Sequence, residues 1–161
     1  MKPREPRVFV LPASYFAHDR VVGGGERYAL EYARALAALT PTTLGLFGLT
    51  ARRETLDRLE IRTFRVRRLT QRWGFPLTRE IWRALREFDA IHCLVFPTPL
   101  TDLLLLAGRM RRQTIVLTDV GGGGACWSTY LGKISPCFNL NRLAHGLALL
   151  SQHSAQSFAG W

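Results

Sequence analysis

Cysteine is scarce in this sequence, and the few cysteines are poorly spaced for a metal or a disulfide. The three residues, Cys93, Cys126 and Cys137, form no Cys-x-x-Cys pair. This spacing predicts neither a zinc site nor a disulfide framework, and free thiols are typical of a reducing cytosol. The five aspartates also lie far apart, with no Asp-x-Asp pair to hold a metal. We therefore expect no metal site and no cofactor.

Lysine is almost absent as well. Only Lys2 and Lys133 are present, so arginine supplies 20 of the 22 basic residues behind the formal net charge of +10. The planar fork of arginine suits phosphates, which makes an anionic ligand or an anionic surface one expectation. A GC-rich genome would produce the same arginine usage without any such partner.

The N-terminal residues contain no long apolar segment. The first apolar run, Val8 to Leu11, is too short for a signal peptide and far too short for a membrane span. We therefore expect a cytoplasmic protein.

The rest of the composition is that of a globular α/β protein. The chain has 161 residues, 47% hydrophobic and 21% charged, enough for a single domain with a core and too few for two ordinary ones. Strands are predicted at 7–12, 42–47, 61–69, 90–96, 114–118 and 147–151, and helices at 26–39, 52–59, 78–88, 100–110, 140–145 and from 152. This alternation predicts a doubly wound parallel sheet of the Rossmann-like type.

Side-chain spacing within these segments predicts the core. Thr78 is expected to cap the helix 78–88, and His92, in an apolar strand, is expected to be a satisfied core residue. The expected buried residues are Tyr28, Tyr32, Ala35, Leu36 and Leu39 in helix 26–39, Ile81, Leu85 and Phe88 in helix 78–88, and Phe64 and Val66 in strand 61–69.

The segment Gly23-Gly24-Gly25-Glu26-Arg27 stands between the first strand and the first helix. Amides at a helix N-terminus lack internal partners and lie at the positive end of the helix dipole. Glycines let a phosphate approach that backbone closely. We therefore expect Gly23, Gly24, Gly25 and Arg27 to face an anion. The alternative is a loop that needs glycine only for a positive φ.

Three familiar motifs do not fit these glycines. A dinucleotide fingerprint would need a third glycine where Tyr28 stands, and a tight turn in place of the ten-residue loop before Gly23. The second glycine run, Gly121 to Gly124, is no P-loop because Gly-Lys-Ser/Thr does not follow at the required spacing. The Gly-x-Ser-x-Gly nucleophile elbow is absent.

Taken in order, these segments resemble the N-terminal domain of the retaining GT-B glycosyltransferases of family 4. That domain opens with a strand, a loop, Gly-Gly-x-Glu/Gln-Arg and a helix that ends in Leu-Ala-x-x-Leu. Here the corresponding segments are RVFVLP, Gly23 to Arg27 and Arg34 to Leu39. Further matches follow in the same order at Phe88 to His92, Thr114 to Asp119 and Leu150 to Ala155. The resemblance covers nearly the whole chain.

The resemblance implies a two-lobed enzyme, with the acceptor bound mainly by the N-terminal lobe and the nucleotide-sugar donor by the C-terminal lobe. Gly23 and Gly24 would lie beside the donor, and Asp119 takes the position of a catalytically important His in many relatives. The donor signature Glu-x7-Glu is missing, and no acidic residue follows Asp119. Residues 1–161 therefore resemble a single acceptor-side domain whose donor-binding domain is absent.

Two loops are expected to line the acceptor cleft. His18 and Asp19 precede the glycines and would reach the carboxyl ends of the strands, where open sheets bind ligands. Gly121, Gly122 and Gly123 would form a mobile loop over the acceptor. An ordinary surface histidine and a disordered surface loop are the alternatives.

A basic segment with one tryptophan is the candidate for contact with a membrane or another anionic surface. It comprises Arg62, Arg65, Arg67, Arg68, Arg72, Trp73 and Phe75. Arg79, Arg83 and Arg86 on the next helix extend it. Lipid-linked acceptors in the family favour peripheral contact with the inner face of the membrane, and a solvated basic face is the alternative. No recognised nucleic-acid motif is present, so nucleic acid is not an expected partner.

The predicted function is transfer of a sugar from a nucleotide-sugar donor to a glycan or lipid-linked acceptor. The chain would be inactive alone, with the other lobe supplied in cis or in trans. The alternatives are a non-catalytic Rossmann-like binding module and the acceptor- or membrane-binding subunit of a split glycosyltransferase. Exposed apolar surface over 147–161 would favour the two-lobed or split enzyme, and a polar face there would favour the module.

Overall fold

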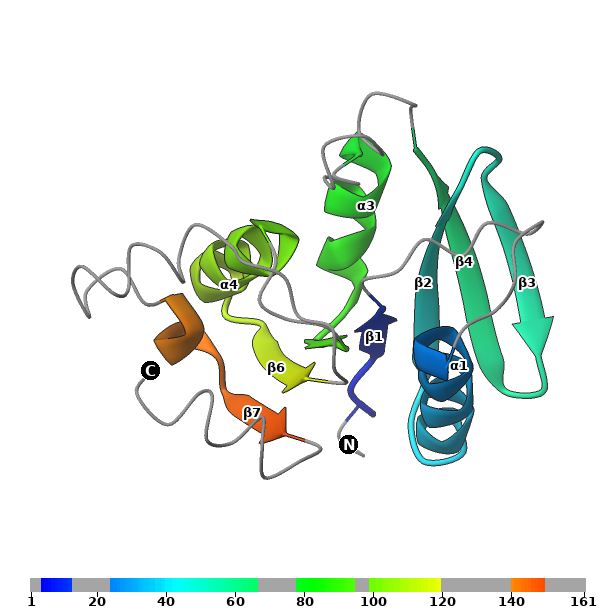
Figure 1. Ribbon diagram of the computed structural model, residues 1–161, viewed down its shortest axis with the longest axis horizontal. Coiled ribbons are helices and arrows are strands. Elements are labelled where there is room, and N and C mark those ends of the chain that lie inside the picture. Colours follow the sequence, from blue (N-terminus) through cyan, green and yellow to red (C-terminus); the bar gives the residue numbers. More distant parts are fainter. Residues whose placement is uncertain (1–3, 13–23, 67–77, 95–98, 120–139, 150–161) are drawn as a thin grey trace. The chain divides into compact units, whose positions relative to one another are not determined.

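The structure, a computed structural model, describes residues 4–12, 24–66, 78–94, 99–119 and 140–149. The chain forms two compact units, residues 1–91 and 92–161, and each is described by itself. The elements (Figure 1) are β1 Val8–Leu11, α1 Gly24–Ala37, β2 Thr42–Gly48, β3 Arg52–Leu56, β4 Leu59–Arg65, α3 Arg79–Ala84, the 3-10 helix η1 Leu85–Glu87, β5 Ala90–Cys93, α4 Pro99–Arg111, β6 Thr114–Asp119, the 3-10 helix η3 Leu140–Leu143 and β7 Gly146–Leu149.

The strands form a mostly parallel sheet with the hydrogen-bonded order β3-β4-β2-β1-β5-β6-β7. The pairs β1–β2, β2–β4 and β6–β7 are parallel, and the edge pair β3–β4 is antiparallel. The chain runs outward from β1 through β2 to β4, and then begins again at β5 on the other side of β1. This reversal is the strand order of a doubly wound sheet, and it confirms the predicted Rossmann-like α/β fold class.

Most predicted elements are confirmed to within a few residues. The predicted strands correspond to β1, β2, β4, β5, β6 and β7, and the helices 26–39, 78–88 and 100–110 correspond to α1, α3 with η1, and α4. The helix expected at 140–145 is the single 3-10 turn η3. The helix expected from 152 lies outside the described residues.

Aromatic side chains form the centre of the first unit. Phe9 of β1 lies 4.9 Å from Phe88 and 6.0 Å from Phe64 of β4, measured between ring centroids. Gly45 of β2 stands beside Phe9, and a Cβ at residue 45 would collide with that ring. The missing side chain at Gly45 therefore makes room for the fully buried Phe9.

The helix α1 packs on β2 and β4 through small side chains. Its buried residues are Ala29, Ala33 and Ala37, which share one face because they are four residues apart. The predicted buried face is therefore wrong: Ala35 is exposed, and Leu39 lies past the end of the helix with 80% of its surface exposed. Methyl groups let the helix approach the strands closely, so the larger residues lie on its flank. Those flanking, half-buried residues are Tyr28, Tyr32 and Leu36.

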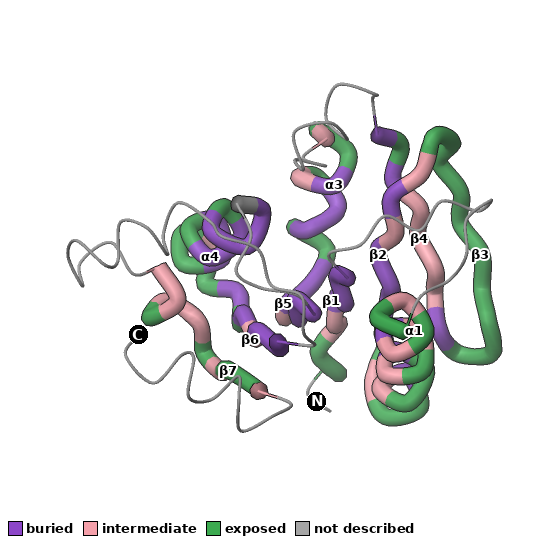
Figure 2. Tube along the Cα trace, in the orientation of Figure 1, coloured by how far each residue is buried: buried purple, intermediate pink, exposed green. Residues whose placement is uncertain are grey.

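Residues 52–59 form the strand β3 and the turn into β4, so the prediction of a helix there is wrong. β3 pairs with β4 from Arg52↔Thr63 to Leu56↔Leu59, so Asp57 and Arg58 make the turn. Asp57 has a φ of 54°, a left-handed conformation that Asp tolerates better than most residues. β3 is exposed along its whole length (Figure 2), so RRETL has no apolar alternation by which a strand could be recognised.

The predictions for helix 78–88 are confirmed. The hydroxyl oxygen of Thr78 accepts a hydrogen bond from the Ile81 amide at 3.3 Å, which is the geometry of an N-cap. Ile81 and Leu85 are fully buried, and Phe88 is 4% exposed. Phe64 and Val66 are buried as predicted, each 2% exposed.

The second unit packs α4 against β6. Leu104 and Leu105 of α4 and Ile115 of β6 are fully buried. A Cβ at Gly108 would lie 2.6 Å from the Ile115 side chain, so glycine is needed where the helix approaches the strand. The helix and the strand therefore approach too closely at this point for a side chain at residue 108.

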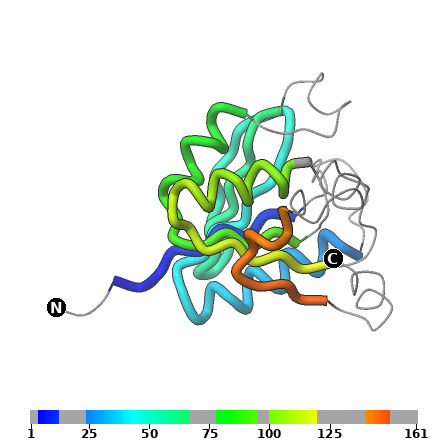
Figure 3. Tube along the Cα trace, turned by 90° about the vertical axis from the view of Figure 1, so that its left-hand side faces the viewer, coloured from blue at the N-terminus to red at the C-terminus, as the bar shows by residue number. Residues whose placement is uncertain are grey.

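The strands β6 and β7 run side by side in the same direction (Figure 3), in register from Val116↔Gly146 to Asp119↔Leu149. The turn between η3 and β7 is fastened to β6 by His145. Its Nδ1 accepts a hydrogen bond of 3.1 Å from the Ile115 amide, and its own amide donates to the Ile115 carbonyl at 2.7 Å.

Candidate functional site

The glycine pair that was expected to face an anion opens α1. Gly24 and Gly25 are the first two residues of the helix, and both are exposed. Neither has a positive φ, and a Cβ at either position would meet no atom within 4 Å. The loop alternative therefore does not explain these two glycines, and neither does packing. The first-turn amides have no partner within the helix and lie at the positive end of its dipole, which suits an anion.

Arg27 and a tyrosine pair accompany the glycines on α1. Arg27 is exposed in the first turn, and Glu26 beside it is half-buried. The rings of Tyr28 and Tyr32 stack with centroids 6.1 Å apart. Burial, and then the neighbouring Tyr28, raises the pKa of Tyr32 above its usual value. Tyr32 therefore keeps its hydroxyl proton at neutral pH.

Several predicted site residues cannot be assigned a place. The strand β1 ends at the buried Leu11, and the buried Pro12 follows it toward the predicted loop. The residues that lie outside the described ranges are His18, Asp19, Gly23, Gly121, Gly122, Gly123, Arg67, Arg68, Arg72, Trp73 and Phe75. Their roles in the acceptor cleft, in the phosphate site and on the basic surface stay predictions.

Asp119, the predicted catalytic residue, is the last residue of β6 and is 6% exposed. The carboxyl ends of parallel strands are where open α/β sheets bind ligands, so its position suits a role in a site. Asp119 belongs to the second unit, whereas Gly24 and Gly25 belong to the first.

His92 and Cys93 at the end of β5 are core residues. The His92 ring is 9% exposed and shares a hydrogen bond of 2.6 Å between its Nε2 and the Thr118 hydroxyl oxygen. Burial lowers the pKa of His92 to about 4, so the ring is neutral at pH 7. Burial also raises the pKa of the Cys93 thiol to about 12. His92 is thus the satisfied core histidine that was predicted, and Cys93 is no thiolate nucleophile.

The described part of the basic segment does not lie on one face. Side chains alternate along β4, so the exposed Arg65 lies on the face opposite to Phe64 and Arg62. The Arg62 side chain is 14% exposed, and its Nη1 lies 3.2 Å from a carboxylate oxygen of Glu87. Among the described residues of the predicted basic patch, Arg65, Arg79, Arg83 and Arg86 are exposed, whereas Arg62 is held against Glu87.

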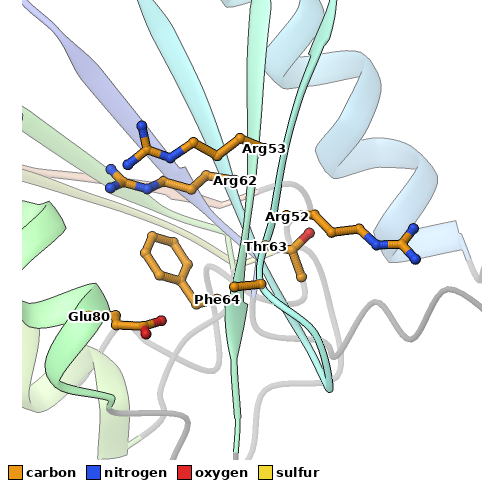
Figure 4. Close-up of a pocket in the computed structure, with 7 residues that line it drawn as sticks. Arg52, Arg53, Arg62, Thr63, Phe64 and Glu80 are labelled. Atoms are coloured by element: carbon orange, nitrogen blue, oxygen red, sulfur yellow. The ribbon is translucent and has the colours of Figure 1, made fainter.

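A hollow that was not predicted lies between the β3–β4 hairpin and α3. Its volume is about 280 Å³. The hollow could not be predicted because residues 52–59 were expected to form a helix, and only a hairpin places Arg53 opposite Arg62. The side chains that line it, shown in Figure 4, are Arg52, Arg53, Arg62, Thr63, Phe64 and Glu80.

No family model and no curated protein matches this sequence. Within the described ranges, no three His, Cys, Asp or Glu residues come together as a metal site would require. The helices in the same ranges include none that is long and apolar enough to cross a membrane. The expectations of no cofactor and of a cytoplasmic location stay predictions.

Proposed function

We propose that this chain is the acceptor-side lobe of a two-lobed glycosyltransferase that moves a sugar from a nucleotide-sugar donor to a glycan or lipid-linked acceptor. One observation carries the proposal. Gly24 and Gly25 open α1, the first helix after β1 in a doubly wound sheet, where a Cβ at either residue would meet no atom within 4 Å and neither residue needs a positive φ. The resemblance to GT-B family 4 assigns this position to the donor phosphates.

The chemistry of sugar transfer explains why this position matters. When the bond between the sugar and the nucleoside diphosphate breaks, negative charge grows on the departing phosphate. Amides in the first turn of α1 would donate hydrogen bonds to its oxygens, and the helix dipole would add to the stabilisation. Glycine at residues 24 and 25 keeps side-chain atoms out of the path of the phosphate. The exposed Arg27 would add a charged contact.

Asp119 is assigned to the sugars. A carboxylate at the end of β6 can accept hydrogen bonds from sugar hydroxyls. Its 6% exposure would favour a fixed orientation over a mobile one. The donor lobe, in cis or in trans, would supply the remaining contacts to the nucleotide.

Titration of the ¹⁵N-labelled chain with nucleoside diphosphates tests the phosphate site. We expect the amide signals of Gly24, Gly25 and Glu26 to shift together at millimolar concentrations, since one lobe alone binds the donor weakly. Gly25→Ala should weaken this binding about tenfold by obstructing close approach, while the helix keeps or gains stability.

Gly146→Ala on β7 is the matched control, because its Cβ would make only an ordinary contact of 3.7 Å with Val116. Its affinity for nucleoside diphosphates should equal that of the unmodified chain. The proposal is contradicted if the α1 amides do not shift, or if Gly25→Ala binds as well as the control.

The second candidate, a non-catalytic module, would expose a polar face at β7. Leu147 is 47% exposed and Ala148 is also exposed on this strand. The described part of 147–161 thus exposes one large apolar side chain, which is normal on the surface of a monomer as well as at an interface.

A further inference from the structure

The hollow between β3, β4 and α3 has the features of a second anion site. It is built entirely within the first unit, and none of its residues belongs to the start of α1. Its assignment therefore does not depend on the proposed glycosyltransferase function.

Two arginines face each other across the hairpin. Arg53 of β3 and Arg62 of β4 are directly opposite in the antiparallel register. Figure 4 shows their side chains extending side by side in the same direction, whereas Arg52 points the opposite way. Like charges at directly opposite positions destabilise a sheet. A bound anion between them would turn this repulsion into two attractive contacts.

Arg62 is already held in place. Its Nη1 lies 3.2 Å from the Glu87 carboxylate, and its guanidinium carbon lies 5.4 Å from the centroid of the Phe64 ring. The side chain is 14% exposed, so it is ordered before any ligand arrives. Fixed, planar donors of this kind suit the oxygens of a phosphate or carboxylate, which they bind in pairs.

Arg53 and Glu80 complete the lining. Arg53 is exposed, and its side chain extends beside that of Arg62 (Figure 4). Glu80, in the first turn of α3, places a carboxylate on the opposite wall (Figure 4). A carboxylate beside an anion site repels a bare anion but accepts hydrogen bonds from hydroxyl groups on the same ligand.

We propose that this hollow binds a phosphate monoester that also carries hydroxyl groups, with the phosphate on Arg53 and Arg62 and a hydroxyl on Glu80. A volume of about 280 Å³ suits a small polyol phosphate. A soluble metabolite and the exposed head group of a lipid could both supply this chemistry.

The primary test compares Arg53→Gln with Arg58→Gln. Both variants lose one exposed arginine charge from the same hairpin, but Arg58 lies in the turn and is not among the residues that line the hollow. With glycerol phosphate as the probe, we expect the arginine Nε signals of residues 53 and 62 to shift together. Arg53→Gln should weaken binding about tenfold, as for the loss of one charged hydrogen bond. Arg58→Gln should bind as the unmodified chain does.

Glu80→Gln tests the hydroxyl contact. The preference for glycerol phosphate over inorganic phosphate should shrink in this variant, because repulsion of the bare anion is removed and the hydroxyl acceptor is weakened. An unchanged preference would overturn the assignment of a hydroxyl to Glu80.

Sedimentation with phosphatidylcholine vesicles that contain phosphatidylinositol 4-phosphate, whose head group carries a phosphate monoester and free hydroxyls, distinguishes the two sources. Vesicle binding that Arg53→Gln abolishes and Arg58→Gln preserves supports the site as one for a lipid head group. Binding of glycerol phosphate alone supports a soluble ligand. The proposal is overturned if neither probe binds, or if the two variants weaken binding equally.

Discussion

His92 shows how burial decides the chemistry of a single residue. The sequence places it in an apolar strand, and this alone predicts a core position. The structure adds the hydrogen bond of 2.6 Å to Thr118 and a pKa lowered to about 4 by burial. A group that resists protonation in the folded state makes stability depend on pH.

The free energy of unfolding is expected to fall as the pH drops from 6.5 to about 4. The unfolded chain takes up the proton at the ordinary pKa of 6.5, whereas folded His92 resists it until about 4. The stabilisation is therefore complete above pH 6.5 and is lost toward pH 4, by up to about 3 kcal/mol. Urea unfolding at a series of pH values measures this loss.

His92→Gln provides the comparison, since glutamine can still bond to Thr118 but does not titrate. Carboxylates contribute equally to both proteins, so the difference between the two curves isolates His92. Parallel curves between pH 6.5 and 4 would refute the effect.

Two glycines show that the role of a single residue does not always follow from the sequence. Gly24 and Gly45 look alike in the sequence, but a Cβ at Gly24 meets open space and a Cβ at Gly45 collides with Phe9. The role of Gly24 could be predicted from its place at the start of a helix. The role of Gly45 depends on which strand lies next to β2, because its contact with Phe9 is between residues far apart in the sequence.

At the scale of elements, the sequence predicted a helix or strand correctly where the residues that stabilise it lie within that same element. The cap at Thr78 and the stripe of Ile81 and Leu85 follow from spacing within one helix, and both are confirmed. The strand β3 fails this condition, because its only apolar residue is Leu56 and its structure comes from pairing with β4. The prediction of the buried face of α1 was wrong because close approach of the helix to the sheet favours alanines over tyrosines on that face.

Loss of the cap should weaken α3. Thr78→Ala removes the acceptor for the Ile81 amide and is expected to lower the free energy of unfolding by about 1 kcal/mol. Chemical denaturation of the variant measures this change.

Thr78→Ser is the matched control, because serine keeps a hydroxyl at the same position. It should recover most of the lost stability. Equal losses for the two variants would show that the methyl group of Thr78, and not its hydroxyl, stabilises the helix.

At the scale of the whole molecule, alternation of strands and helices was enough to predict the doubly wound sheet. The same alternation predicted the position of the candidate phosphate site, since Gly24 and Gly25 open the helix that follows the first strand. The pair Arg53 and Arg62 could not be predicted, because it depends on the register of a hairpin that was taken for a helix.

The proposed function predicts that residues 1–161 alone do not turn over a nucleotide sugar. The departing phosphate would have contacts from one lobe only, and the donor would bind weakly. Release of nucleoside diphosphate from a panel of nucleotide sugars measures this. Steady turnover by the purified chain, without any partner, would contradict the two-lobed proposal.

The exposed edge strand β3 has one more consequence. An uncovered edge is a template on which a strand from another molecule can pair, and this is how many sheet proteins aggregate. In β3, Arg52 and Arg53 project to opposite sides and Glu54 follows them, so a strand added there would have to bury charge on both faces. The same residues that shape the hollow thus protect the protein from edge-to-edge association and fibre growth.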